Sequence, residues 1–474
     1  MLFSSTTFIY LFFPTVLFLY FIVLRNHLKL QNIMLLGVSL FFYAWGEPEF
    51  ALIMILSIVV NYVFGLLIHN AQEKEKPKNA KTVLVLTVVF NLTILFIFKY
   101  LNFSVKTIND IFGSSIPVPG IALPIGISFF TFQAMSYVID VYRGDGAVQK
   151  NVLNVGLYIS FFPQLIAGPI VRYQTIAEQI YDRKVTYDDF SEGFNRFVIG
   201  LGKKVIISNS VALFADRIFD AVGKGDEFAT LTYWLGVICY TLQIFYDFCG
   251  YSDMAIGMGR MFGFHFLENF DYPYISTSIT EFWRRWHISL GTWFRDYIYI
   301  PLGGNRVSKP RELFNLFVVW FLTGVWHGAN WTFIIWGLMY FVLLVIEKTT
   351  GFYKAEGKFK KAILWLYSMF FVVIGWVMFR AESVGAAFDY LVGMFTMKNG
   401  AFFDEYFIAS FKQIIFYVLL GVIFSFPWVK KLKEKVKPNA FTKIVYVCCI
   451  LIVFVLSIAS ITSSSYNPFI YFNF

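Results

Sequence analysis

The stretch Leu322-Thr-Gly-Val-Trp-His-Gly-Ala-Asn330 places one histidine between two apolar segments, residues 312–326 and 331–347. An ionisable side chain inside an apolar membrane segment is costly, so His327 predicts a functional site. Each segment, about 15–17 residues long, would extend roughly 22–25 Å as a helix, slightly less than the ~30 Å hydrocarbon layer. The glycines at positions 324 and 328 permit a helix break and close backbone approach. The stretch therefore predicts a hairpin with His327 at its tip, inside the membrane and toward its outer half.

The composition is that of a polytopic membrane protein. Of the 474 residues, 58% are hydrophobic and 15% are charged, whereas soluble proteins are about 25% charged. The formal net charge of +9 comes from basic residues in short loops, which indicates membrane topology rather than a nucleic-acid surface. We expect an all-α membrane protein with about 11–13 membrane helices, including re-entrant or short helices, around a central funnel or tunnel.

Apolar segments recur from end to end, so we expect a single membrane domain over residues 1–474. Its main motifs fall within about residues 121–347, with flanking helices in 1–100 and 361–474. The candidate membrane segments are 8–24, 30–46, 49–68, 82–100, 121–142, 151–168, 193–213, 229–262, 312–326, 331–347, 362–379, 411–427 and 443–463.

Basic loops predict the orientation in a bacterial cell membrane. A cytoplasmic position is consistent for four basic segments, which are Arg25 with Lys29 and residues 73–81, 348–361 and 430–437. Both chain termini then lie outside, and residues 381–410 form an outer loop. The four cysteines, in apolar segments and without a CxxC pair, predict core residues rather than metal ligands, so we expect no metal site.

A second charged stretch runs from Ser278 to Asp296 and reads SITEFWRRWHISLGTWFRD. Ser278 and Glu281 have the spacing of a capping box, which predicts a helix start. In one continuous helix His287 would share a face with three large apolar residues, Trp283, Leu290 and Phe294. The arginines of this interfacial or re-entrant helix either hold donor phosphates or anchor the helix at lipid phosphates.

Each candidate residue also has a purely structural interpretation. His327 and His287 could be hydrogen-bonded histidines that support helix packing. Asp253 could orient a histidine, line a polar path or cap a broken helix. The sequence has no G-x-S-x-G elbow, Walker A sequence, HExxH or Rossmann glycine pattern, which disfavours serine hydrolases, P-loop transporters and zincins.

The chain contains four long motifs, which are Leu123–Gln133, Phe161–Arg172, Asp247–Asp253 and Phe282–Arg306. Together they resemble the motifs of the membrane-bound O-acyltransferase family, in its bacterial alginate O-acetyltransferase branch. The resemblance extends over nearly the whole chain. Cys249 departs from the pattern, where a small hydroxyl residue is expected. The related D-alanyl transfer proteins of teichoic acid modification share the Trp-His pair, and Pro301-Leu-Gly-Gly-Asn-Arg306 favours the polysaccharide branch.

The resemblance implies a multi-pass acyltransferase that carries an acyl group, expected to be acetyl, from a cytoplasmic donor to an extracytoplasmic acceptor. His327 corresponds to the essential histidine of the family and His287 to its second histidine. The donor would be acetyl-CoA or an acyl carrier, bound as a substrate, and no resident cofactor is expected. The implied partners are an extracytoplasmic polysaccharide or an exported accessory acetyltransferase, together with membrane lipids and with no nucleic acid.

The chemistry of the residues agrees with this expectation. Acyl transfer to a hydroxyl needs a base, and imidazole, with an ordinary pKa of ~6.5, suits that task. We assign His327 as general base, His287 and Asn330 to polarising the carbonyl or orienting the donor, and Arg284 and Arg285 to donor phosphates.

Three further residues, Trp286, Trp326 and Asp253, complete the predicted substrate site. A transporter or channel with proton-relay histidines would require paired half-helices in two repeats, which the sequence lacks. A non-catalytic scaffold of an exopolysaccharide export complex is the remaining alternative.

Overall fold

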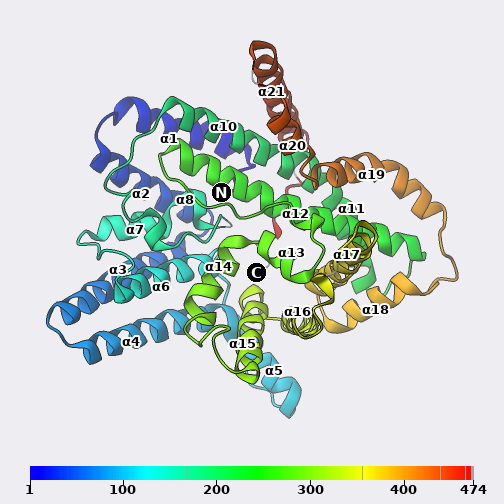
Figure 1. Cartoon of the computed structure of the whole chain (residues 1–474), viewed down its shortest axis with the longest axis horizontal. Helices are drawn as coiled ribbons and strands as arrows, with labels where there is room; N and C mark the ends of the chain where they lie inside the picture. The colour runs from blue at the N-terminus through cyan, green and yellow to red at the C-terminus, as the bar shows by residue number, and fades with distance from the viewer. Residues whose placement is uncertain (167, 355, 438, 465, 471–474) are drawn as a thin grey trace. The chain divides into compact units, whose positions relative to one another are not determined.

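The computed structural model describes residues 1–166, 168–354, 356–437, 439–464 and 466–470, which form helices and loops and contain no β-strand (Figure 1). The all-α prediction is therefore confirmed. The predicted span at 151–168 and the predicted external C-terminus both include positions outside the described residues, namely 167, 465 and 471–474.

The chain divides into two compact units. Unit 1 comprises Met1–Phe197 with Tyr251–Leu267, and unit 2 comprises Val198–Gly250 with Glu268–Phe474. The helices of unit 1 are η1 (Phe8–Phe12), α1 (Phe13–Phe18), η2 (Leu19–Val23), α2 (Leu28–Ala44), α3 (Pro48–Glu73), α4 (Pro77–Leu95), η3 (Phe96–Tyr100), α5 (Leu101–Phe112), α6 (Ile127–Arg143), α7 (Val152–Ser160), α8 (Phe162–Leu165) and α9 (Tyr173–Ile176). Two helices, α10 (Tyr187–Gly202) and α12 (Thr230–Met261), contribute residues to both units.

Unit 2 carries the two histidine motifs. Its helices are η4 (Lys203–Ser208), α11 (Asn209–Gly223), η5 (Pro273–Ile275), α13 (Ile279–Arg285), α14 (Ile288–Phe294), η6 (Arg295–Tyr299), α15 (Lys309–His327), α16 (Trp331–Thr350), η7 (Phe352–Lys354), α17 (Lys358–Arg380), α18 (Val384–Phe395), α19 (Glu405–Phe424), α20 (Trp428–Lys435) and α21 (Ala440–Ser463). The single-domain prediction stays a prediction.

Seven helical segments of the described chain are long and apolar enough to cross a membrane. These are Pro48–Glu73, Pro77–Phe112, Tyr187–Gly223, Trp331–Thr350, Lys358–Arg380, Glu405–Phe424 and Ala440–Ser463. Three shorter apolar helices, Phe8–Val23, Leu28–Ala44 and Val384–Phe395, accompany them. The chain is thus a polytopic membrane protein, and the total of about 11–13 membrane helices stays a prediction.

The helices differ in how much of their surface the protein itself covers. Only 11% of the most apolar part of α21 is buried, and Val455 on it is 63% exposed. An apolar helix with so little protein contact requires lipid around it. By contrast, α6 buries nearly all of its residues, so it belongs to the interior of unit 1.

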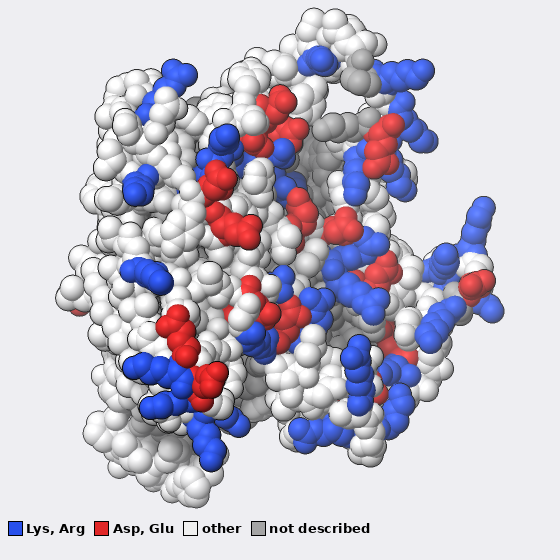
Figure 2. Space-filling view, turned by 60° about the vertical axis from the view of Figure 1, so that its left-hand side comes forward, with Lys and Arg blue, Asp and Glu red and all other residues white. Residues whose placement is uncertain are grey.

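Figure 2 shows the charged side chains of one face in mixed clusters of both signs, separated by broad uncharged areas.

Three predicted segments differ from the structure. The predicted helix at 121–142 begins only at Ile127, after Gly126 in the left-handed region at φ +75°. The predicted span at 151–168 is interrupted because α7 ends at Ser160 and Pro163 lies in the first turn of α8. The predicted outer loop 381–410 contains helix α18, which the Ser383 side chain caps by accepting a hydrogen bond from the Ala386 N–H.

Candidate active site

The hairpin of α15 and α16 positions His327 as the last residue of α15. Both helices approach closely at two glycines: a Cβ on Gly324 would lie 2.6 Å from the Phe333 carbonyl oxygen, and one on Gly337 would lie 2.5 Å from the Trp320 carbonyl oxygen. Small residues of this kind allow helix backbones to touch. The predicted hairpin with His327 at its tip is confirmed, although α15 is not broken at Gly324. The depth of the tip in the membrane stays a prediction.

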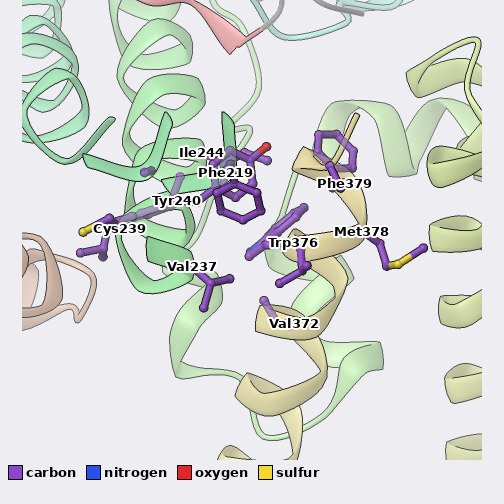
Figure 3. Close-up of a cluster of buried hydrophobic side chains, with 14 of the residues drawn as sticks. Phe219, Val237, Cys239, Tyr240, Ile244, Val372, Trp376, Met378 and Phe379 are labelled. Carbon is purple, nitrogen blue, oxygen red and sulfur yellow. The ribbon is translucent and has the colours of Figure 1, made fainter. Parts of the chain in front are cut away.

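Aromatic rings surround the His327 imidazole, which is 5% exposed. The ring centroids of Trp326, Trp336 and Phe379 lie 5.0, 5.1 and 5.2 Å from that of His327. Phe379 belongs to α17, and Figure 3 shows part of the hydrophobic core to which this helix contributes, with Trp376 directed toward α11 and α12 while Met378 points away from them. The rings limit the motion of the imidazole and reduce its access to water.

The second histidine motif begins at α13, and α16 fixes where that helix starts. The Ser278 hydroxyl accepts a hydrogen bond from the Glu281 N–H at 2.9 Å, so the predicted N-cap is confirmed. The Glu347 carboxylate near the end of α16 accepts further bonds from the backbone N–H groups of Ile279 at 2.6 Å and Thr280 at 2.9 Å. A carboxylate on otherwise unpaired N–H groups stabilises a helix start, so this contact ties α13 to the hairpin that carries His327.

The prediction of one continuous helix through His287 is wrong. Helix α13 ends at Arg285 and α14 begins at Ile288. Between them His287 adopts a left-handed conformation, with φ +47° and ψ +53°. This turn redirects the chain, so His287 does not share a helix face with Trp283, Leu290 and Phe294. A non-glycine residue in this conformation costs about 1–3 kcal/mol and is a frequent feature of functional sites.

Trp326 lies next to both histidines. Its ring centroid is 6.1 Å from that of His287 and 5.0 Å from that of His327. Phe248 also packs against His287, with 4.5 Å between the ring centroids. The structure therefore brings together His287, Trp326 and His327, three residues predicted from the sequence.

A polar group of the protein holds the His287 ring. The Nδ1 atom lies 3.1 Å from Oδ1 of Asn269. Nε2 is buried and has no hydrogen-bond partner among the described residues. His287 lies outside the seven candidate membrane helices, and burial, followed by the nearby His327, lowers the pKa of its imidazole well below the ordinary range. The ring is therefore neutral at neutral pH.

The remaining residues of the second motif have different surroundings. The Arg285 guanidinium forms ion pairs with Asp271 at 2.9 Å and Glu281 at 3.0 Å. Arg284 is exposed and forms no ion pair with any described residue. Trp286 is 4% exposed and packs 4.8 Å from Trp376 between ring centroids. None of these contacts tests the predicted binding roles, which stay predictions.

Asn330 and Asp253 have structural contacts of their own. The Asn330 side chain caps α16 by accepting a hydrogen bond from the Thr332 N–H at 3.1 Å, and it donates one to the Glu382 carbonyl at 2.9 Å. Asp253 belongs to unit 1, where its carboxylate pairs with Arg196 at 2.9 Å.

Sequence reasoning did not identify Glu347 or Asn269. A carboxylate at the end of the apolar run 331–347 was a signal for Glu347, because a charged residue there needs a partner. Asn269 had no such signal, since it precedes His287 by 18 positions and follows no periodic pattern.

No described group of three or more His, Cys, Asp or Glu residues could hold a metal ion. The site consists instead of two imidazoles, aromatic rings and hydrogen-bonding side chains. Two imidazoles in a site of low water access can accept and return protons, which is the requirement of general acid–base catalysis.

A family model and several relatives of known type agree on the family to which this chain is similar. The model of the membrane-bound O-acyltransferase family matches residues 147–388, a range that includes both histidines. The chain is 40% identical to a probable alginate O-acetylase of Pseudomonas putida, with 100% of each chain covered. It is 36% identical to a peptidoglycan O-acetyltransferase of Helicobacter pylori, over 83% of this chain and 80% of that protein. A teichoic acid D-alanyltransferase of Bacillus subtilis is 31% identical over 52% of this chain and 62% of its own length.

Proposed function

The chain belongs to the membrane-bound O-acyltransferase family and is an O-acyltransferase, and on this premise we propose that it moves acetyl groups across the membrane toward hydroxyls of an extracytoplasmic polysaccharide. The donor is a cytoplasmic thioester, acetyl-CoA or an acyl carrier, that binds as a substrate. The reaction takes place in the bacterial cell membrane, with exported accessory acetyltransferases completing transfer onto the polymer.

The acceptor is proposed from relatives that match more than four fifths of this chain. The names of two such relatives contain alginate and peptidoglycan, and both of these polymers contain polysaccharide strands. D-alanyl transfer to teichoic acid is the second candidate, because a D-alanyltransferase also matches. That match covers about half of the chain and has lower identity, so it supports the alternative less strongly.

The observation that supports the mechanism is the pair of buried histidines, His287 and His327, which both lie next to Trp326. In the proposed reaction His327 takes the proton of the attacking hydroxyl as its oxygen bonds to the thioester carbonyl carbon. The carbon–sulfur bond then breaks, and the proton on His327 passes to the departing thiolate. The products are an O-acetyl ester and a free thiol, and the base is restored.

The neighbouring residues have supporting roles in this proposal. The rings of Trp326, Trp336 and Phe379 keep water from the base and from the thioester, which limits hydrolysis. The exposed Arg284 suits the phosphate groups of a CoA or carrier donor.

The proposal predicts that His327→Ala abolishes acetylation of the surface polymer. Without the base, the transfer rate should fall by about 10²–10⁴-fold, while expression and membrane insertion remain normal. A strain lacking this gene is complemented with the variant, and the surface glycan is analysed by mass spectrometry for acetyl and D-alanyl esters. His265→Ala is the matched control, because the His265 side chain is 54% exposed and lies in unit 1.

Each outcome has a distinct meaning. Loss of acetyl esters supports the proposed base and acceptor, and loss of D-alanyl esters would establish the teichoic acid alternative. Unchanged levels of both acetyl and D-alanyl esters in His327→Ala would refute the catalytic role and favour a transporter or a scaffold.

A further inference from the structure

The turn that carries His287 is held by a short preceding loop. The Ile288 N–H donates to the Asn269 carbonyl at 2.9 Å, and the Asp271 N–H donates to the Arg285 carbonyl at 3.0 Å. Arg285 also donates from Nη1 to the Asp271 carbonyl at 3.0 Å. These bonds on both sides of His287 explain how the chain maintains its left-handed conformation.

Asn269 contributes its side chain as well as its backbone to this arrangement. Its Oδ1 accepts hydrogen bonds from the backbone N–H of Ser289 at 3.2 Å and from the Ser289 hydroxyl at 2.9 Å. Because a backbone N–H can only donate, the amide atom that faces Ser289 must be the oxygen. The Ser289 N–H donor therefore determines the orientation of this amide, although its oxygen and nitrogen atoms have similar sizes.

The same oxygen faces His287. Since Oδ1 can only accept, Nδ1 of His287 at 3.1 Å must carry the proton. In a neutral imidazole the other nitrogen, Nε2, then has the lone pair. Nε2 is buried and without a hydrogen-bond partner among the described residues, so it offers an acceptor in the candidate site.

We propose that Asn269 is a positioning residue of the acyltransferase, which holds His287 as the Nδ1–H tautomer so that Nε2 accepts a hydrogen bond from an O–H or N–H group of a substrate. This rests on the proposed function. It also changes the role expected for His287, because a neutral ring with Nε2 unprotonated cannot polarise a carbonyl by donating a proton to it. His287 instead orients a substrate while His327 moves the proton.

Two substitutions separate the acceptor function of Asn269 from its volume. Asn269→Leu has a similar size but no acceptor, whereas Asn269→Asp retains an oxygen for Ser289 and His287. The purified full-length protein is labelled with ¹⁵N-histidine, and its NMR spectrum reports which nitrogen of each ring is protonated. The chain has five histidines, and His287→Gln identifies the signal of interest by its loss.

We expect His287 to be protonated at Nδ1 in the natural chain and in Asn269→Asp, and to become a mixture of tautomers in Asn269→Leu. Transfer should fall by about 10²-fold or more in Asn269→Leu, since a wrong tautomer disables a catalytic histidine. Asn269→Asp should retain activity within about tenfold. A protonated Nε2 in the natural chain would overturn the proposal, and so would an unchanged tautomer in Asn269→Leu.

The two readouts distinguish this inference from the proposed function. The tautomer is measured without any acyl transfer, so its result holds whatever the acceptor is. A correct tautomer in a protein that acetylates no polymer would refute the proposed function alone. If Asn269→Leu does not fold, the spectrum of the natural chain and that of Asn269→Asp still decide where the proton lies.

Discussion

Two adjacent arginines illustrate how residue surroundings separate structural from binding roles. Arg285 pairs with Glu281 within α13 and with Asp271 of the loop that holds His287, whereas Arg284 is exposed. We expect Arg285→Gln to lower the free energy of unfolding by about 1 kcal/mol and to lower kcat, because the His287 turn loses one of its supports. Thermal unfolding in detergent and steady-state kinetics measure the two effects.

Arg284→Gln is the matched comparison. It should change the free energy of unfolding by less than about 0.5 kcal/mol, and it should raise KM for the thioester donor with little change in kcat. A loss of stability as large as that of Arg285→Gln would contradict the assignment of Arg284 to donor phosphates.

Asn330 provides a second test at the residue scale. Its amide caps α16 and contacts the Glu382 carbonyl, so its contacts are those of a helix cap. We expect Asn330→Ala to reduce the free energy of unfolding by about 1 kcal/mol and Asn330→Ser, another capping residue, to restore most of it. Activity should follow stability in both variants, as measured by thermal unfolding and initial rates.

The role predicted for Asn330 in polarising the substrate carbonyl leads to a different expected result for Asn330→Ser. The hydroxyl of a serine is too short to replace an amide donor at the same position. A stable Asn330→Ser protein with transfer reduced by about 10²–10³-fold would establish the catalytic role instead of the structural one.

At the scale of elements, the contact between α15 and α16 determines where His327 lies. Alanine at Gly324 or Gly337 would place a methyl group against backbone oxygens of the partner helix, which cannot be relieved by a side-chain rotation. We expect each substitution to lower the free energy of unfolding by about 1–3 kcal/mol and to reduce transfer, because the separated helices displace the imidazole. Unfolding curves and initial rates measure these effects.

Gly37 in α2 is the control for this pair. A Cβ there would meet no atom within 4 Å, and alanine favours a helix interior by about 1 kcal/mol over glycine. Gly37→Ala should therefore be neutral or stabilising. Equal effects of all three substitutions would show that helix propensity, rather than the contact between α15 and α16, determines the outcome.

Helix positions could be predicted from sequence where apolar residues fill a whole segment. Residues 229–262 and 443–463 match α12 and α21 within a few positions, because lipid or a buried core demands a continuous apolar surface. The break at His287 could not be predicted in this way. It depends on hydrogen bonds from the loop at Asn269, a tertiary interaction that overrides the helical spacing of the surrounding residues.

For the candidate site, the informative signal was the free-energy cost of placing a titratable side chain among apolar residues. His327 and His287 are titratable groups among apolar residues, and the structure brings both next to Trp326. Asn269 and Glu347 act through backbone groups that a sequence does not mark, since any helix start or turn offers such groups. Chemistry-bearing residues are therefore easier to identify in sequence than the residues that position them.

At the scale of the whole molecule, the proposed reaction requires that the donor and the acceptor lie on opposite sides of the membrane. The basic segment 73–81 is expected in the cytoplasm and the connection between α18 and α19 outside. Single cysteines test this, at Lys78 and at Met397, whose side chain is 61% exposed. The exposed Cys448 and Cys449 are first replaced by serine.

We expect a membrane-impermeant maleimide to label Met397→Cys in right-side-out vesicles and to label Lys78→Cys only after the membrane is permeabilised. The buried Cys239 and Cys249 remain unlabelled in both and serve as an internal control. Labelling of Lys78→Cys alone in intact vesicles would show that the orientation is the opposite of the predicted one. Both ends of the α15–α16 hairpin, Lys309 and Thr350, would then lie outside, and the proposed cytoplasmic access of the thioester to His327 would have to be abandoned.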